Sequence, residues 1–578
     1  MRAIGRIGLV NPWLLGAPVA VGGAFVCAWG CRRVWSQRRD LAPRIVGYLA
    51  RPAPALAAIC CAAAVGLIAI WTAAPEVQYD ALSAKEWLPA LWAREGHIFI
   101  PQETPQMFVT GSALDAFLPG HTVGGAATAR YSAFFLGGVL CVLVRRLVRP
   151  WVSRGSAAIL SAVFLATPHL LWQMSTAFDD LELALAALAL AALAVGLQPS
   201  GVLDGVLMGI LVGSAVNAKL HLAVFAGVVA CVWLLRVHGK RRGLHVLAGA
   251  VAGAFVTAGT VLIERWVEFG NPVLPALNAV FRSREYPPIN ESYNFPFAAD
   301  GGLHALLDFL PSVVFAPTTY VEATPPGAYG LLPFVLLIYL LAGWCIPTPG
   351  GLAVWAGTAI AVAAWWIEVR YLRYLIPYFV VALVMVAPVA GRVEVWATAA
   401  FRTAVRRRTP SAHGAVSTLF LAAMFAAAPA TVLAGFWNVP GRIPIATVFG
   451  AEAADAYQLR SMPGVAAIQA INRLTPSDSL TVVDPALVYQ RTLLEGRRNL
   501  LPMWEFVKLT TWFIDRGDLR GPLGSASAWR GRGVSWAAIS EAKLDSGDYD
   551  PRVTAVIRAA GRAVWQEGDV VLVEIPRR

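Results

Sequence analysis

Charged side chains are scarce in this sequence of 578 residues. Asp, Glu, Lys and Arg make up 14% of it, whereas 57% of its residues are hydrophobic and its mean hydropathy is +0.60. A soluble domain of average composition contains about 25% charged residues. This chain has more apolar surface than one soluble core of its length could bury. The composition therefore excludes a soluble globular protein and predicts a polytopic membrane protein.

Cysteine is also sparse, and its placement excludes a covalent framework. All of the cysteines lie in or at the ends of apolar runs, so neither a disulfide framework nor a cysteine-based metal site is implied. The seven are Cys27, Cys31, Cys60, Cys61, Cys141, Cys231 and Cys345. The net charge of +12 could suggest a nucleic-acid partner. However, the basic residues form short clusters between apolar runs, as in loops that fix membrane topology, so we expect a membrane and no nucleic acid.

The apolar runs predict the membrane domain. About twelve runs of roughly 17–22 residues are long enough, as helices, to cross a hydrocarbon layer of roughly 30 Å. We place them at residues 11–30, 55–74, 126–147, 155–172, 181–197, 202–217, 220–236, 244–263, 329–346, 351–369, 374–390 and 415–436. Residues 1–436 are thus expected to form a polytopic α-helical membrane domain with two polar outer loops, 75–125 and 264–328. The Ala- and Gly-rich composition of these runs permits close helix packing in lipid.

The basic clusters predict the orientation of these helices. If every run crosses once, four clusters fall on one side: Arg32–Arg39, Arg145–Arg154, Arg236–Arg242 and Arg402–Arg408. The inward loops then hold about nineteen Lys and Arg against about ten in the longer outward loops, which makes that side cytoplasmic. The loops that contain Asp80 and Asp179 face outward. Alternatively, residues 1–30 are a cleaved signal peptide, but the Arg-rich cluster after them would then have to be translocated.

The composition changes from about Ala451 to a soluble mixture with balanced charge. Residues 465–474 (VAAIQAINRL) predict an amphipathic helix, and residues 479–484 (SLTVVD) and 570–575 (VVLVEI) predict strands. We therefore expect residues 437–578 to form a small α/β domain outside the membrane, on the outer side.

Asp80 is the best candidate for a catalytic group. It follows the apolar run Ala55–Ala74 and stands near the start of an amphipathic stretch, Val77–Phe99. A carboxylate at the outer surface can meet both a lipid-borne reagent and water-soluble partners, and it is the usual base for a hydroxyl proton. The alternative is that Asp80 only caps the helix that follows.

Asp179 and Asp180 are adjacent carboxylates at a predicted membrane boundary. Holding both charged there is costly, so one should pair with a cation or a metal, or point into a polar cavity. Oxygen ligands of this kind suit a divalent metal ion, which leaves metal dependence open. The alternative is helix capping with favourable dipole placement.

Six motifs appear in order, mostly at predicted outward helix ends. They are YDALSAKEW (79–87), TAFDDLELALAALAL (176–190), NAKLHL (217–222), EFGNPVLPALNAVF (268–281), RYLRYLIP (370–377) and AYQLRSMPGVAAIQAIN (456–472). The series resembles bacterial GT-C glycosyltransferases, whose members include lipid A aminoarabinose transferases and protein O-mannosyltransferases, over most of residues 55–475. Two features depart from the family: the amino terminus lies outside by charge, and TAFDDLE has two carboxylates where one is usual.

The resemblance implies a function. Such an enzyme takes a sugar from a polyprenyl-phosphate lipid and transfers it, with inversion, to a hydroxyl of a glycan, lipid or protein. It would lie in the bacterial inner membrane with its active site facing the periplasm. Asp80 matches the acidic residue of the family's first outer loop, and Asp180 is the closer match to the second acidic position, which helps to hold a metal or orient the acceptor.

The leaving group in such a reaction is an anionic polyprenyl phosphate, so cations should converge on it. The candidates at outward helix ends are Lys219 with His221, and Arg370 with Arg373; we favour Lys219 and Arg370 as phosphate ligands. Alternatively, these cations are interfacial anchors whose charged ends extend to the membrane surface.

Three other functions compete with this interpretation. A polysaccharide polymerase or ligase that uses a polyprenyl-diphosphate donor would also place basic residues in an outer loop. A lipid or solute transporter would show inverted repeats, broken helices or charged residues near the middle of the membrane. A scaffold role would leave the grouping of Asp80, Asp180 and Arg370 without a purpose.

Overall fold

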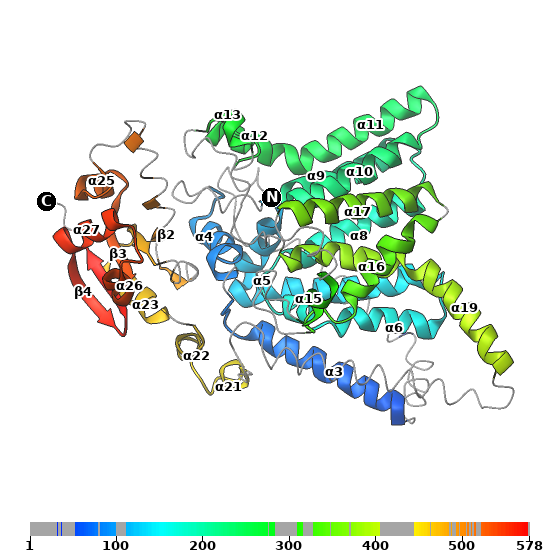
Figure 1. Ribbon diagram of the computed structural model, residues 1–578, viewed down its shortest axis with the longest axis horizontal. Helices are drawn as coiled ribbons and strands as arrows, with labels where there is room; N and C mark the ends of the chain where they lie inside the picture. The colour runs from blue at the N-terminus through cyan, green and yellow to red at the C-terminus, as the bar shows by residue number, and fades with distance from the viewer. Residues whose placement is uncertain are drawn as a thin grey trace. The chain divides into compact units, whose positions relative to one another are not determined.

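The computed structural model of the chain (Figure 1) describes most of the predicted helices and the carboxy-terminal sheet. The described residues are 52–78, 81–99, 111–274, 277–283, 309–315, 327–346, 348–368, 371–404, 444–462, 464–484, 498–503 and 522–575, with a few single residues elsewhere, such as Leu487 and Phe506. The predicted runs 11–30 and 415–436 lie outside them, so the expected number of spans stays a prediction.

The chain separates into two compact units, each built from three segments. The first comprises Met1–Ala73, Thr110–Leu262 and Ser292–Pro444, and the second comprises Ala74–Val109, Ile263–Glu291 and Ile445–Arg578. This division does not test the domain boundary that the sequence predicts at residue 437, which stays a prediction.

The first unit is a bundle of apolar helices. Its main helices are α3 (Pro52–Ala73), α5 (Gly111–Val148), α6 (Arg154–Leu165), α7 (Pro168–Gln173), α8 (Asp180–Gly196), α9 (Val202–Ala218), α10 (Leu220–Leu235), α11 (Lys240–Ala254), α15 (Phe309–Phe315), α16 (Leu332–Ala342), α17 (Pro349–Glu368), α18 (Ile376–Met385) and α19 (Ala387–Ala404). Among the described residues, three helical stretches are long and apolar enough to cross a membrane: Phe117–Val148, Lys240–Phe269 and Leu372–Trp396. Several shorter apolar helices accompany them.

The run predicted over residues 155–172 forms two helices instead of one. Thr167, which precedes Pro168, has an extended backbone (φ −83°, ψ 114°), and Pro168 starts α7. The residue before a proline is disfavoured in the helical region, which explains the break. The predicted run 374–390 likewise starts with a 3-10 turn, η7 (Leu372–Leu375), before α18 begins.

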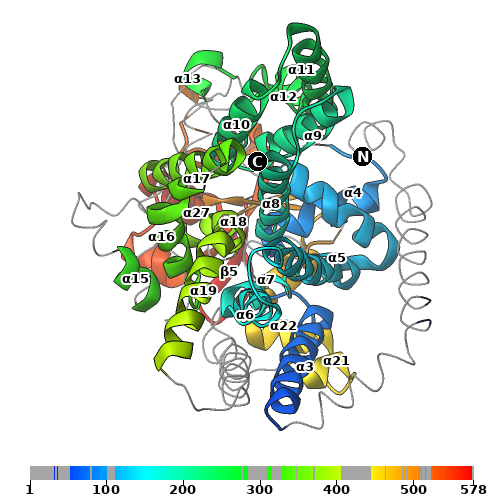
Figure 2. The same cartoon turned by 90° about the vertical axis from the view of Figure 1, so that its right-hand side faces the viewer.

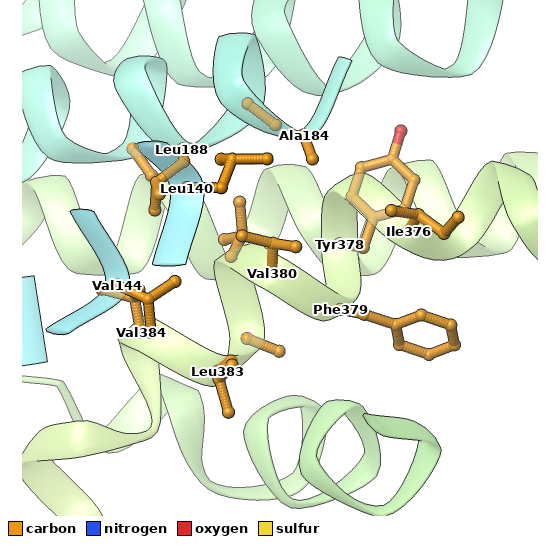
Figure 3. Packing of buried hydrophobic residues seen from close by; sticks show 14 of the residues in the cluster. Leu140, Val144, Ala184, Leu188, Ile376, Tyr378, Phe379, Val380, Leu383 and Val384 are labelled. Atoms are coloured by element: carbon orange, nitrogen blue, oxygen red, sulfur yellow. The ribbon is translucent and has the colours of Figure 1, made fainter. Parts of the chain in front are cut away.

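Helices α8 and α18 form the centre of this bundle. All ten residues of α18 are buried, as expected for a helix that is hydrophobic on every side. Figure 2 shows α8 and α18 between α5 on one side and α16 and α17 on the other. Figure 3 shows the core at closer range, where Leu140 of α5 and Leu188 of α8 lie near Val380 of α18.

Helices α9 and α11 pack through glycines. A Cβ atom added at Gly205 or Gly209 of α9 would lie 2.0 Å from a backbone oxygen of α11, and one added at Gly249 of α11 would lie 2.2 Å from the Val202 oxygen. The two backbones therefore lie so close together that only glycine, which has no Cβ atom, fits at these positions. Small residues have this role in membrane helices because lipid offers no hydrophobic force that drives helices together.

Replacing Gly209 by leucine is expected to force α9 and α11 apart. We expect the Gly209→Leu variant to lose about 3 kcal/mol of unfolding free energy, at the upper end of overpacking costs. Gly227→Leu in α10 is the matched control, because a Cβ atom there meets nothing within 4 Å. Thermal unfolding in detergent compares the two, and equal midpoints would contradict the glycine contact.

The second unit contains a five-stranded sheet of order β2-β1-β3-β5-β4. The strands are β1 (Leu480–Val483), β2 (Asn499–Pro502), β3 (Val534–Ser540), β4 (Arg562–Glu567) and β5 (Val570–Glu574). Strand β1 is parallel to β2 and β3, whereas β5 is antiparallel to both β3 and β4. The strands predicted from SLTVVD and VVLVEI are β1 and β5, so both predictions are confirmed.

Helices cover both faces of this sheet. Alternate strand residues point to opposite faces: Val483, Leu500 and Leu572 pack with α23 (Val465–Leu474) on one face. Their neighbours Val482, Leu501 and Val573 pack on the other face with residues of α25 (Ala526–Gly531) and α27 (Pro551–Ala560). Helix α23 has the bounds that the sequence predicted.

Residues 74–99 belong to this second unit and pack on its carboxy-terminal segment, which begins at Ile445. The segment 74–99 contains a short π-helix, η2 (Ala81–Lys85), and α4 (Trp87–Glu95). Leu82 packs against Met462 and Val465, and Gln458 Nε2 donates a hydrogen bond to the Glu76 carbonyl oxygen at 3.1 Å. The segment that surrounds Asp80 is therefore fastened to the unit that contains the sheet.

Candidate active site

Asp179 and Asp180 stand where α8 begins. Asp179 occupies the N-cap position, yet its side chain accepts no capping hydrogen bond from this helix. Asp180 is the first helical residue, and its side chain is fully buried. These carboxylates therefore have a partner other than the end of their own helix.

That partner is Lys219. It lies between α9 and α10, where its extended backbone (φ −151°, ψ 142°) separates the two helices. Its Nζ atom donates to Asp180 Oδ1 at 2.6 Å and lies 3.5 Å from Asp179 Oδ1. The lysine side chain is 9% exposed and the two carboxylates are 2% and 0% exposed. Burial makes the interaction strong and makes the loss of either partner costly.

Aromatic rings bring a second cation to the same place. The Lys219 Nζ atom lies 4.0 Å from the centre of the Tyr374 ring, and the Arg373 guanidinium lies 5.6 Å from the same ring. Arg373 also lies 5.1 Å from the ring of Phe178, the residue before Asp179. His221 stacks on Tyr374 with ring centres 5.2 Å apart. Such cation–π contacts stabilise positive charge where water is excluded.

A chain of buried polar side chains reaches Asp180 from the other side. Gln173 Nε2 donates to Asp180 Oδ2 at 3.1 Å and lies 3.3 Å from His169 Nε2. The His169 ring stacks on Tyr329 with centres 4.6 Å apart. Because Lys219 holds one oxygen of Asp180 and Gln173 holds the other, the orientation of this carboxylate is fixed.

The structure brings together five of the seven residues that the sequence singled out: Asp179, Asp180, Lys219, His221 and Arg373. Asp80 and Arg370 lie outside the described residues. The sequence reasoning did not select His169, Gln173, Tyr329 or Tyr374. The available signal was a polar residue within the apolar run 155–172 for His169 and a polar residue directly after that run for Gln173. The RYLRY motif was the signal for Tyr374.

The formal charges in the cluster balance. Two carboxylates, Asp179 and Asp180, stand against two cations, Lys219 and Arg373. No group of three or more His, Cys, Asp or Glu side chains in the described part of the chain could hold a metal ion. The Lys219 ammonium group contacts both carboxylates in this arrangement, and a metal role for Asp179 and Asp180 stays a prediction.

A separate polar cluster lies in the sheet. Asp484, directly after β1, accepts hydrogen bonds from Tyr549 Oη at 2.6 Å and from Lys543 Nζ at 2.9 Å. Burial and the bond to Asp484 raise the pKa of Tyr549 well above its usual value, so the phenol stays protonated and donates. This cluster fastens α26 (Glu541–Ser546) and the loop after it to the sheet, and its polar groups satisfy one another.

No protein-family model and no curated protein matches the chain. Several solved structures do match it. ArnT from Cupriavidus metallidurans in the apo state is 16% identical, with 90% of this chain and 97% of that chain covered at a TM-score of 0.54. The same protein bound to undecaprenyl phosphate is 18% identical, with 90% and 98% covered at a TM-score of 0.51.

Two further structures match with TM-scores below 0.5. The arabinofuranosyltransferase AftD from Mycobacteria is 13% identical, with 90% of this chain but 41% of that chain covered at a TM-score of 0.45. The Archaeoglobus fulgidus oligosaccharyltransferase, tethered with an acceptor peptide, is 11% identical, with 84% and 69% covered at a TM-score of 0.40. The likeness to ArnT over nearly the whole of both chains shows that this chain has the GT-C fold, as the sequence predicted.

Proposed function

We propose that this GT-C-fold chain is a membrane glycosyltransferase that moves a sugar from a polyprenyl-phosphate donor to a hydroxyl acceptor at the outer face of a bacterial cytoplasmic membrane. The observation that supports it is the buried Asp179, Asp180 and Lys219 cluster, in a fold shared with ArnT, one structure of which holds undecaprenyl phosphate. Each charged group stands at a helix end: Asp180 begins α8, Lys219 separates α9 from α10 and Arg373 precedes α18.

In the proposed reaction Asp80 is the general base. Its carboxylate takes the proton of the acceptor hydroxyl, and the acceptor oxygen attacks the anomeric carbon from the face opposite the phosphate. The bond between that carbon and the phosphate oxygen breaks, so the configuration inverts and polyprenyl phosphate leaves as an anion. The acceptor is a glycan, a lipid or a protein.

The cations have the complementary role of stabilising the leaving phosphate. Lys219 and Arg373 both present positive charge beside the Tyr374 ring, and Arg370, three residues before Arg373, joins them in the proposal. Asp180 orients Lys219 through the 2.6 Å contact, and His221 supports Tyr374 by stacking. Donors arranged in advance around developing charge supply much of an enzyme's rate enhancement.

The donor class separates this proposal from its nearest competitor. Purified protein is incubated with undecaprenyl-phosphate-linked and undecaprenyl-diphosphate-linked sugars in parallel, and the released lipid phosphate is measured. We expect release from the monophosphate donors, because ArnT, which shares this fold, has been solved with undecaprenyl phosphate bound. Release from the diphosphate donors alone would contradict the proposal and favour a polysaccharide polymerase or ligase.

A further inference from the structure

A second site lies in the same helical unit, at the opposite end of α8 from Asp180. It is a cavity of about 830 Å³ between the carboxy-terminal half of α8 and the α18–α19 segment. Leu188 of α8 and Val384 of α18, both labelled in Figure 3, are among its lining residues. Its volume is within the roughly 300–1,000 Å³ of typical ligand pockets. No residue of the Asp180 cluster lines it, so the proposed reaction does not account for it.

The cavity lies in the half of the helix bundle farther from the Asp180 cluster. With a rise of 1.5 Å per residue, Leu188 and Gly196 lie about 12 Å and 24 Å along α8 from Asp180. Basic residues gather at this end: Arg145 and Arg146 end α5, and Arg236 donates a hydrogen bond to the Ala194 carbonyl oxygen at the end of α8. By the positive-inside rule this is the cytoplasmic end.

The lining is apolar apart from Thr348 and one charged side chain. Of the described residues that line it, Arg392 of α19 is the only charged one. Its side chain is exposed. The nearby carboxylate of Glu394 accepts a hydrogen bond from the Ser153 amide at 3.0 Å instead. Arg392 is thus available to an anion at the edge of an apolar chamber.

Two tryptophans mark the membrane surface beside that charge. Trp151 and Trp396 line the cavity and are 54% and 73% exposed. Tryptophan is enriched where headgroups meet the hydrocarbon layer. The backbone around Trp151 is held close to α19, because a Cβ atom at Gly391 would lie 2.1 Å from the Trp151 oxygen. The aromatic edge and Arg392 therefore belong to one packed surface.

We infer that this cavity binds one anionic phospholipid of the cytoplasmic leaflet. An acyl chain fills the apolar space between α8 and the α18–α19 segment, and the phosphate contacts the Arg392 guanidinium between the two tryptophans. Arginine matches phosphate geometry with paired donors, and basic pockets between membrane helices on the cytoplasmic side recognise anionic headgroups. The inference depends on the predicted orientation and not on the proposed reaction.

Native mass spectrometry tests the headgroup and the chain separately. The full-length protein is reconstituted with phosphatidylglycerol or with phosphatidylcholine. The protein is then released from the bilayer in the mass spectrometer, and the lipids that stay bound to it are counted. We expect one phosphatidylglycerol, and no phosphatidylcholine, to be retained selectively. Arg392→Gln should weaken that retention about fivefold, the effect of one basic residue near the membrane surface. Ala192→Phe, which places a ring in the cavity, should abolish it.

Arg154→Gln is the matched control, since Arg154 is an exposed arginine at the same end that does not line the cavity. Circular dichroism establishes that each variant folds, and the exposed Arg392 position keeps that variant informative if Ala192→Phe does not fold. Equal retention of the two lipids, or an equal loss in the Arg154 and Arg392 variants, would overturn the inference.

A photo-cross-linker placed at Val195, another lining residue, identifies the occupant directly. A mass increase equal to one phospholipid supports the inference. A cross-link to residues 1–50 or 405–443 of the same chain, or to a second copy, would show that protein fills the space and would overturn it.

Discussion

Replacing Lys219 by methionine should reduce glycosyl transfer by about a hundredfold to a thousandfold, the usual effect of removing a group that stabilises charge in the transition state. It should also lower the free energy of unfolding by about 3 kcal/mol, because the buried Asp179 and Asp180 carboxylates lose the ammonium that neutralises them. Turnover of the donor and thermal unfolding measure the two effects.

A double variant separates those effects. Lys219→Met combined with Asp180→Asn removes one negative charge together with the positive one, so most of the lost stability should return. Activity should not return, because no ammonium faces the leaving phosphate. Recovery of full turnover in the double variant would show that the cluster is only structural. Failure to recover stability would show that the pairing of Lys219 with Asp180 is not what stabilises this region.

The second large effect is expected at Asp80. Asp80→Asn keeps the shape of the side chain and removes its basicity, and a positioned general base contributes typically about 10²-fold to 10⁴-fold to the rate. We therefore expect turnover to fall by about a thousandfold while donor binding is nearly unchanged. Donor binding is measured by titration of the protein with the lipid-linked sugar, and turnover by release of polyprenyl phosphate.

Glu95→Gln is the matched control for that substitution. Glu95 ends α4 in the same segment; its side chain is 13% exposed, and its carboxylate lies 3.9 Å from the half-exposed Arg94. The same change from acid to amide should leave turnover within about twofold, since an ion pair of this length contributes little. If Asp80→Asn keeps normal turnover, Asp80 is not the base, and the mechanism proposed here is wrong.

Local patterns in the sequence predicted many of the elements correctly. Residues 465–474 form a helix with the predicted bounds because their apolar residues recur at helical spacing and are buried on one face. The short run of β-branched and apolar residues in VVLVEI predicted β5, whose three central residues are buried. The break at Thr167 and Pro168 was also readable, since proline restricts the residue before it, but the apolar character of the run concealed it.

The site was only partly predictable from the sequence. Charged residues in apolar surroundings identified Asp179, Asp180, Lys219 and Arg373, because burying a charge is costly and needs a partner. Their pairing was not identified: Lys219 was expected to face a phosphate, and the structure shows its bond to Asp180. Gln173 follows the predicted run 155–172 and was not singled out; only the structure places it against that carboxylate.

The sequence alone determined that this protein belongs in a membrane, where most of its helices lie and which charged residues need an explanation. Composition and periodicity are enough for this because burial of apolar surface depends on each segment by itself. Only the tertiary structure decided that Lys219 lies between two carboxylates, that residues 74–99 pack on the unit that contains the sheet, and that a cavity opens beside Arg392. These features depend on contacts between residues distant in sequence, which are set by how the helices pack.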